Sequence, residues 1–201
     1  MITPAPVLLR MTDLKNWAYC RRVVYYHRLM PDAAPMTGKM RSGLKAQELM
    51  EKLELRRTLE RYGFDGAATR RLYGSWLTSE ALGLSGRVDL ALLREDTGEA
   101  AVVDYKLTSG EPGDNHRMQL HGYALLVESA YPGVTVSRAF LFRIPDDRVF
   151  VIPIEEEWRE RVREAVVGIG EMVREQALPE ATEVRGRCED CEFANYCGDV
   201  W

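Results

Sequence analysis

The residues of this chain that could do chemistry begin with two aspartates on an expected β-hairpin. Residues 95–98 (Glu-Asp-Thr-Gly) indicate a turn between two apolar strands. Pairing Arg94 with Glu99 across this turn sets an antiparallel register. In that register Asp89 lies directly opposite Asp104, with Cβ atoms about 4.5–5.5 Å apart. Like charges at this spacing are destabilising unless a cation lies between them, so the pair indicates a divalent-cation site.

A lysine completes the pattern. Lys106 follows Asp104 by two positions, so the period of two in a strand places both side chains on one face. Two carboxylates and an ammonium on one face suit phosphodiester hydrolysis, because the carboxylates hold Mg²⁺ or Mn²⁺, which generates hydroxide. The lysine would stabilise developing negative charge or orient the attacking water. The alternative is a surface strand in which Asp104 pairs with Lys106 and Asp89 is solvated.

An amide and a phenol follow on the next expected helix. Gln119 and Tyr123 are four positions apart and therefore share a helix face, where they could position a nucleotide or a water molecule. The alternative is a solvated glutamine and an ordinary packed tyrosine.

The cysteines form a second constellation. Cys188, Cys191 and Cys197 lie within ten residues near one end, and Cys20 lies near the other. Four thiolates suit zinc or an iron–sulfur cluster, and the spacing alone does not choose between them. A redox pair or inert packed thiols are the alternatives. A bound metal would join the first helix to the tail structurally, because four thiolate ligands leave no open position for hydrolysis.

The elements that must position these residues alternate between helices and strands. In chain order we expect a helix from Thr12 or Asp13 to about Leu29, a helix over 37–62 ended by Gly63, strands over 72–77, 84–93 and 101–107, a helix over 114–131, a hairpin of 137–144 and 148–154, and a helix over 155–176. The tail over 177–201 is irregular. This pattern predicts a mixed α/β domain with helical and cysteine-bearing ends.

Composition limits the function classes. The 201 residues are 46% hydrophobic, which excludes a disordered chain and a disulfide-dense scaffold. No apolar run approaches the ~20 residues of a transmembrane helix, and no signal peptide is evident, so we expect a cytoplasmic protein with reduced thiols and no membrane partner. The net charge of −4 argues against nucleic acid. A basic stretch over 56–71 and an acidic run at 155–157 nevertheless leave room for a local basic groove.

The order of these motifs resembles a known family. The motifs are Cys20, Arg41-Ser42-Gly43, Gly86-Arg87-Val88-Asp89, Asp104-Tyr105-Lys106, Gln119-x-x-x-Tyr123 and the three C-terminal cysteines. Together they closely resemble the RecB-like nucleases of the PD-(D/E)xK superfamily that carry an iron–sulfur cluster. The short length and Cys20-Arg21-Arg22 resemble the fourth CRISPR-associated (Cas) protein family.

The resemblance implies a fold and an activity. It implies one RecB-like nuclease domain over 1–201, with a restriction-endonuclease-type core at 37–176 and a cluster-binding region formed by 1–35 and 177–201. It implies a metal-dependent DNA exonuclease that trims single-stranded prespacer ends and helps select PAM-bearing prespacers for the CRISPR integrase complex of the first and second Cas proteins. Members are sometimes fused to the integrase. The alternative is a catalytically weak iron–sulfur subunit that recognises PAM ends and docks on that complex.

The resemblance also implies residue roles. Asp89, Asp104 and the Tyr105 carbonyl would be metal ligands, Lys106 the catalytic lysine, and Gln119 and Tyr123 parts of the site. Cys20, Cys188, Cys191 and Cys197 would hold a 4Fe–4S cluster. We expect Arg21, Arg22, Arg41 and Arg87 to contact DNA.

One position departs from the family. The first motif usually ends in a metal-binding histidine four residues after Gly43, and here that position is Gln47. Its carbonyl oxygen can ligate a hard cation but is a poorer donor than imidazole to transition metals. We therefore expect Gln47 as a metal ligand in a weakened, more Mg²⁺-like site, or else compromised activity. His116 or His121 could supply a nitrogen, although a lone histidine there is more typical of packing.

Overall fold

A mixed sheet forms the centre of the computed structural model, which describes residues 8–31, 58–189 and 191–198 together with five single residues of 38–50. Within that part of the chain the strands are β1 (Leu9–Arg10), β2 (Arg70–Ser79), β3 (Leu84–Arg94), β4 (Glu99–Lys106), β5 (Thr135–Arg143) and β6 (Arg148–Pro153). They are ordered β1-β3-β4-β5-β6, and β2 pairs with β3. The β1–β3 and β4–β5 pairs are parallel and the others antiparallel.

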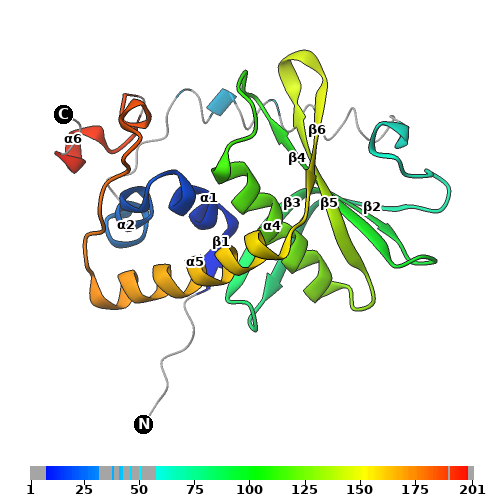
Figure 1. The fold of residues 1–201 in the computed structure, drawn as a ribbon, viewed down its shortest axis with the longest axis horizontal. Helices are drawn as coiled ribbons and strands as arrows, with labels where there is room; N and C mark the ends of the chain where they lie inside the picture. Colours follow the sequence, from blue (N-terminus) through cyan, green and yellow to red (C-terminus); the bar gives the residue numbers. More distant parts are fainter. Residues whose placement is uncertain are drawn as a thin grey trace, which may run out of the picture.

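Helices lie on one face of this sheet and beyond one of its ends. They are α1 (Met11–Tyr19), α2 (Arg21–Leu29), α4 (Asp114–Ala130) and α5 (Glu156–Glu175), with short turns at η2 (Glu60–Tyr62), η3 (Ile144–Asp146), η4 (Arg185–Arg187) and α6 (Ala194–Cys197). Figure 1 shows α4 in front of the strands and α5 running from α4 toward α2, while α2, α6 and the C-terminal segment gather beyond one end of the sheet. No helix in the described part of the chain is both long and apolar enough to span a membrane.

The two faces of the sheet bury two separate cores. On β4, Ala100 and Val102 face the helices, whereas Ala101 and Val103 face the opposite core. This alternation follows from the period of two in a strand. Because both faces are covered, β4 is almost entirely buried, which is why it reads as a continuous apolar run. The expected mixed sheet flanked by helices is therefore confirmed.

The hairpin that carries the aspartates has the expected register. Arg94 pairs with Glu99, and the pairing continues to Leu90 and Val103. Strand and helix bounds elsewhere agree with the expected ones to within about two or three residues, the usual ambiguity at element ends.

The first helix differs from its prediction. It is two helices, because Cys20 has extended backbone (φ −162°, ψ 121°) between α1 and α2. The first of them also begins earlier than expected, at Met11. The N-cap residue is Arg10, and neither Thr12 nor Asp13. Asp13 lies in the first turn, where its carboxylate accepts the Arg10 N–H at 2.7 Å.

The expected helix over 37–62 lies mostly outside the described residues. Where the structure describes the end of this range, the prediction is wrong, because residues 58 and 59 are not helical and Glu60–Tyr62 is a separate short turn. That turn stops at Gly63, whose φ of 70° is left-handed. That conformation suits glycine and terminates a helical turn.

Candidate active site

The two aspartates lie where the β3–β4 hairpin opens. The ladder stops at Leu90 and Val103, one pair before Asp89 and Asp104. Beyond the ladder, the Asp89 carboxylate replaces a backbone carbonyl as hydrogen-bond acceptor, because its Oδ2 accepts the Tyr105 N–H at 2.9 Å. A side chain thus replaces a ladder bond, and both carboxylates are held at the same end of the hairpin.

The other side of β3 is also irregular at Asp89. The β2–β3 pairing skips Gly74 and Asp89, and Gly74 has a φ of +53°. Val88 and Ala91 both face the helix-side core although they are three positions apart, so the strand's alternation shifts between them. The Arg87 guanidinium covers Gly74, and its Nε donates to the Gly74 carbonyl at 3.0 Å. Any side chain at position 74 would collide with that guanidinium.

Asp104 and Lys106 form a buried ion pair. The Lys106 Nζ lies 2.9 Å from Oδ1 and 2.8 Å from Oδ2 of Asp104. Asp104 is only 2% exposed, so the alternative interpretation as a surface strand is wrong for this residue, although the Asp104–Lys106 pair that it included is present. Burial alone would lower the pKa of the Lys106 ammonium, but the Asp104 and Asp89 carboxylates outweigh it and raise that pKa. The lysine therefore stays cationic at neutral pH.

Gln119 and Tyr123 close the site from α4. Both are buried, so the alternative of a solvated glutamine is wrong. The Tyr123 hydroxyl donates to the Arg87 carbonyl at 2.7 Å, and the Gln119 side chain hydrogen-bonds to the Tyr123 hydroxyl. Burial, and then the charges of Asp104 and Asp89, raise the pKa of the Tyr123 phenol, so it stays protonated.

Unpaired oxygens in this site suit a divalent cation. Among the described residues, Gln119 Oε1 is buried with no hydrogen-bond donor. Asp104 Oδ2 lies 2.8 Å from Lys106 Nζ, but it accepts no hydrogen bond of good geometry from the described residues. Buried oxygen acceptors without donors are the ligand type that Mg²⁺ and Mn²⁺ prefer. The donor set therefore fits such an ion, although no three His, Cys, Asp or Glu side chains of the described part converge as a complete site. Gln47, the expected further ligand, lies outside the described residues.

The two histidines of α4 have different surroundings. His121 is fully buried: its Nδ1 lies 2.7 Å from the Arg117 carbonyl, and its Nε2 accepts the Glu155 N–H at 3.2 Å. The packing interpretation is thus confirmed for His121. His116 Nδ1 accepts the Gly113 N–H at 3.2 Å, and burial, followed by the Lys106 charge, lowers the pKa of its ring to about 4. The neutral His116 ring therefore carries its proton on Nε2. This nitrogen can donate a hydrogen bond but cannot coordinate a metal ion in that form.

Sequence reasoning missed Lys15 of α1. Burial, with the positive charge of Lys106, lowers the pKa of its ammonium to about 8, while Asp104 and Glu192 act in the opposite direction. The Lys15 side chain is thus near the aspartate–lysine pair. The only sequence signal was the helical spacing of Lys15 from Met11 and Leu14, which by itself indicates no more than a helix face.

The cysteines come from two chain segments that meet. Cys20, Cys191 and Cys197 pack against a small core of Val23, Tyr26 and Phe193. None of the four cysteines forms a disulfide, and burial raises the pKa of the Cys191 thiol, with Cys20 and Cys188 adding to that effect. The donor set suits zinc or an iron–sulfur cluster. Within the described residues, however, the thiols do not stand in a preformed metal-ligating group.

Side-chain contacts tie these two segments together. Arg22 Nε donates to the Pro179 carbonyl at 2.8 Å and its Nη1 lies 3.4 Å from Cys197 Sγ. Arg187 Nη1 donates to the Tyr19 carbonyl at 2.6 Å, and the Tyr19 hydroxyl donates to the Arg187 carbonyl at 3.1 Å. The first helical segment and the tail are therefore in contact through protein atoms alone.

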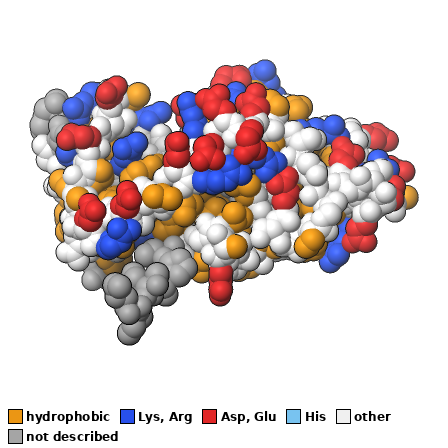
Figure 2. Space-filling model, turned by 60° about the horizontal axis from the view of Figure 1, so that its bottom comes forward, with side chains coloured by type: hydrophobic (Ala, Val, Ile, Leu, Met, Phe, Trp, Pro, Cys, Tyr) orange, Lys and Arg blue, Asp and Glu red, His pale blue; other side chains and the backbone are white. Residues whose placement is uncertain are grey.

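The four arginines expected to contact DNA have different surroundings. The Arg21 guanidinium stacks on the Trp17 ring, with Cζ 4.9 Å from the ring centroid. The Arg22 guanidinium hydrogen-bonds to the tail at the Pro179 carbonyl. Arg41 is exposed, and Arg87 covers Gly74. Elsewhere many basic side chains pair with acids, and Figure 2 shows acidic and basic groups interleaved on one face. The 56–57 part of the expected basic stretch lies outside the described residues.

Comparisons with known proteins agree with this geometry. The model of the PD-(D/E)XK nuclease superfamily matches residues 18–198. The CRISPR-associated exonuclease Cas4 of Francisella tularensis subsp. novicida (strain U112) is 27% identical over 188 residues, which cover 92% of this chain and 91% of that protein. The CRISPR-associated exonuclease Cas4/endonuclease Cas1 fusion of Myxococcus xanthus (strain DK1622) is 30% identical over 210 residues, covering 97% of this chain but 33% of the fusion.

A solved structure supports the fold. The crystal structure of SSO0001 superposes with a TM-score of 0.54 at 18% identity, covering 96% of this chain and 87% of that one. At that identity the likeness concerns the fold alone. The match of the family model over nearly the whole chain, together with two relatives of the same kind, leads to one conclusion: this chain belongs to the PD-(D/E)XK nuclease superfamily and is Cas4-like within it.

Proposed function

We propose that this protein is a metal-dependent DNA exonuclease acting on single strands and overhangs. The observation that carries the proposal is the buried Asp104–Lys106 pair beside Asp89, which the hairpin register and α4 hold together. Two relatives named as Cas4 exonucleases support the activity class. A bound Mg²⁺ or Mn²⁺ would supply hydroxide at neutral pH and neutralise the phosphate.

Each side chain has a defined task in this proposal. Asp89, Asp104 and the Tyr105 carbonyl hold the cation, with Gln47 as a further oxygen ligand. Lys106, which stays protonated, presents positive charge to the phosphate as negative charge develops on it. The Gln119 amide oxygen is available to orient a water or a nucleotide. Tyr123 holds the Arg87 carbonyl and keeps β3 in place against α4.

We also assign a 4Fe–4S cluster to Cys20, Cys188, Cys191 and Cys197. The support is the four-thiol donor set, the packing of three of these cysteines on one small core, and the Cas4-like relatives. Its role is structural, because it would fix the tail to the first two helices. A cluster of this type absorbs visible light, so a colourless anaerobic preparation with stoichiometric zinc would contradict the assignment.

The proposed setting is CRISPR adaptation. One relative is a fusion of Cas4 with the endonuclease Cas1. We infer that this chain works with the integrase complex of the first and second Cas proteins, trims single-stranded prespacer ends and helps select prespacers that bear a PAM. Co-purification with those partners, followed by spacer-integration assays with and without this chain, tests the inference.

A second function is favoured by Gln47. A glutamine stands where the family has a metal-binding histidine, and the described residues do not converge as a three-ligand site. The candidate is an iron–sulfur subunit that binds PAM ends and docks on the integrase with little cleavage of its own.

One experiment separates the two functions. Labelled single-stranded and overhanged DNA is incubated with Mg²⁺ or Mn²⁺ and the wild type, Asp104→Asn or the control Asp96→Asn. Asp96 is an exposed aspartate paired with Arg94 in the β3–β4 turn. Cleavage that Asp104→Asn abolishes and Asp96→Asn preserves supports the exonuclease. Tight binding without cleavage by the wild type supports the subunit, and neither binding nor cleavage contradicts both.

A further inference from the structure

A half-buried cation of α1, Lys15, lies beside the nuclease site and has no ion-pair partner among the described residues. Among the described residues no carboxylate forms a salt bridge with Lys15, and its attractive neighbours, Asp104 and Glu192, act only at longer range. The residue also belongs to no family motif identified in the sequence. A buried ammonium that is not paired destabilises the fold.

Two glycines let α1 approach the site closely. A Cβ atom at Gly86 of β3 would lie 2.8 Å from Met11 Cβ, and one at Gly122 of α4 would lie 2.5 Å from Met11 Sδ and 2.8 Å from Leu14 Cδ1. Lys15 is one turn after Met11 and adjacent to Leu14, so it projects from the side of α1 that packs on these elements.

The direction of α1 carries Lys15 toward the catalytic residues. Met11 touches α4 at Gly122, whereas Ala18 lines a common cavity with Met118 and Asp114 at the beginning of α4. The two helices therefore run antiparallel. Lys15, between Met11 and Ala18, comes level with the turn of α4 that carries Gln119. Its electrostatic coupling to both Asp104 and Lys106 agrees with this placement.

The neighbours of Lys15 favour an anion over a cation as its partner. Lys106 Nζ already lies within 2.9 Å of both oxygens of Asp104. The neutral His116 ring, electrostatically coupled to Lys15 and Lys106, carries its proton on the outer nitrogen. Three nitrogen groups, those of Lys15, Lys106 and His116, are thus electrostatically coupled to the one carboxylate of Asp104. A DNA phosphate bound here would form an ion pair with the Lys15 ammonium. That ion pair would offset the free-energy cost of removing the ammonium from water.

We propose that Lys15 binds a phosphate of the DNA strand next to the scissile one, so that α1 supplies a substrate-positioning residue to the nuclease site. The identification of the bound strand as the substrate strand rests on the proposed exonuclease function. The phosphate contact itself does not depend on that function.

The test compares Lys15→Met, Lys15→Arg and the control Arg163→Met. Arg163 is a surface cation of α5 that pairs with Glu156 and Glu160. We measure the Kd for labelled single-stranded DNA in EDTA at several salt concentrations, kcat and KM with Mn²⁺, and thermal melting. Lys15→Met should weaken binding roughly tenfold, reduce the slope of log K against log salt by about 0.7, and raise KM more than kcat falls. Lys15→Arg should recover much of the binding, and Arg163→Met should change none of these values.

Thermal melting distinguishes the proposed role from a structural one, because the two roles predict Tm changes of opposite sign for Lys15→Met. Lys15→Met should raise Tm, because it removes a desolvated charge, whereas a lysine that holds the fold together would lower Tm when replaced. Unchanged Kd and salt slope, or a lowered Tm, would overturn the proposal. If the wild type binds but does not cleave, and Lys15→Met still loses affinity, the exonuclease proposal fails while this one stands. If the wild type binds no DNA, both fail.

Discussion

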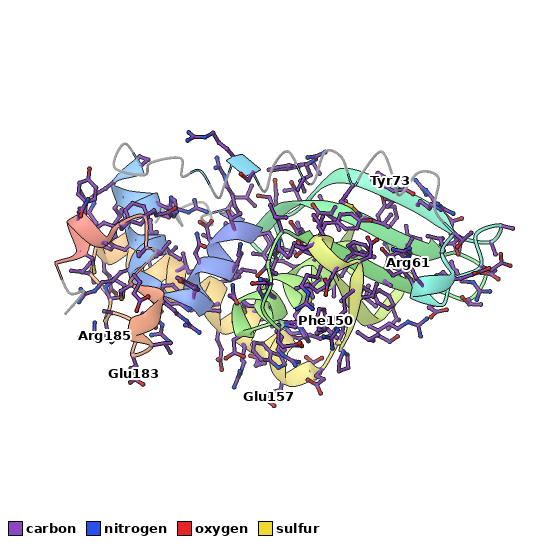
Figure 3. The ribbon with its side chains drawn as sticks, turned by 90° about the horizontal axis from the view of Figure 1, so that it is seen from above. Arg61, Tyr73, Phe150, Glu157, Glu183 and Arg185 are labelled. Carbon is purple, nitrogen blue, oxygen red and sulfur yellow. The ribbon has the colours of Figure 1, made fainter. Side chains whose placement is uncertain are left out.

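The candidate nuclease site and the cysteine region are assembled in different ways. The aspartates stand on paired strands, and backbone register, one side chain-to-backbone bond and a buried ion pair fix them. The cysteines stand on a break between two helices and on an irregular tail, held by arginine and tyrosine contacts across the chain ends. In Figure 3, Arg61 and Tyr73 mark the sheet end, and Glu183 and Arg185 mark the opposite end.

Because of this difference, a cation in the candidate nuclease site and a cluster in the cysteine region would have different roles. The carboxylates of the candidate nuclease site are positioned by the sheet without a cation, so a bound cation would add chemistry more than structure. Three of the four cysteines share a small core, but the thiols form no ligating group in the described residues, so a cluster would draw them together and complete the fold of the tail. Removing each metal should therefore give different results, and five changes test this comparison from the largest expected effect to the smallest.

The largest effect is expected at Lys106. Lys106→Met should reduce kcat by roughly 10²–10³-fold, because it removes the positive charge beside the phosphate. Single-turnover cleavage assays at saturating metal measure this loss. The variant also leaves Asp104 buried without its partner, so the comparison includes the double variant Lys106→Met/Asp104→Asn. The double variant reports on stability alone, because Asp104→Asn is itself expected to abolish cleavage. Lost cleavage by a Lys106→Met protein that is still folded in the assay supports a catalytic role, and retained cleavage contradicts it.

The second effect concerns the approach of α1 to α4. Gly122→Ala should destabilise the protein by about 1–3 kcal/mol, because the added Cβ overlaps Met11 and Leu14. The matched control is Gly170→Ala on α5, where nothing lies within 4 Å and the change should add about 0.5–1 kcal/mol. Urea unfolding of both variants measures the difference. Equal stabilities would mean that α1 does not pack as described.

The third effect is a pH dependence at Lys15. Its pKa falls from 10.5 in the unfolded chain to about 8 in the folded one, chiefly through burial. Below pH 8 the ammonium is charged in both states and burial costs the fold about 1–3 kcal/mol. Between pH 8 and 10.5 only the unfolded chain binds the proton, so wild-type stability rises with pH relative to Lys15→Met.

Unfolding free energies at pH 7 and pH 10.5 measure this difference. The advantage of Lys15→Met should be full at pH 7 and nearly absent at pH 10.5. An advantage that does not change with pH would argue against a desolvated ammonium and would remove one support for the phosphate contact.

The fourth effect is confined to the cysteine region. Cys20→Ser should increase amide exchange in the contact segments, 18–27 and 185–197, by about tenfold or more, while β4 keeps its protection. The reason is that the cluster would supply much of the force that joins the segments. Hydrogen exchange followed by mass spectrometry resolves the two regions. Equal loss of protection in β4 would show that the two regions are not separate.

The smallest effect is expected at Gln47. Gln47→His should raise Mn²⁺-dependent cleavage by a few-fold, because imidazole is the better donor to a transition metal, and should change Mg²⁺-dependent cleavage less. Metal titrations of the cleavage rate give both values. No change with either ion would argue that position 47 does not contribute a ligand.

Much of the nuclease site could be predicted from the sequence because it depends on short-range periodicity. The turn at 95–98 determined the register of the hairpin, and the period of two placed Asp104 and Lys106 on one face. The spacing of Gln119 and Tyr123 likewise placed both on one face of α4, where both are buried. Their tasks in cleavage stay predictions.

Only the tertiary structure decided the features that depend on how elements approach one another. The extended backbone of Cys20, the turn of Arg22 toward the tail and the closeness of Lys15 to Asp104 all arise between segments far apart in the sequence. Periodicity carries no information about such contacts, because they depend on which small residues allow which helices to pack. The sequence determined the chemistry and register of the sheet, and packing decided which helix residues join it.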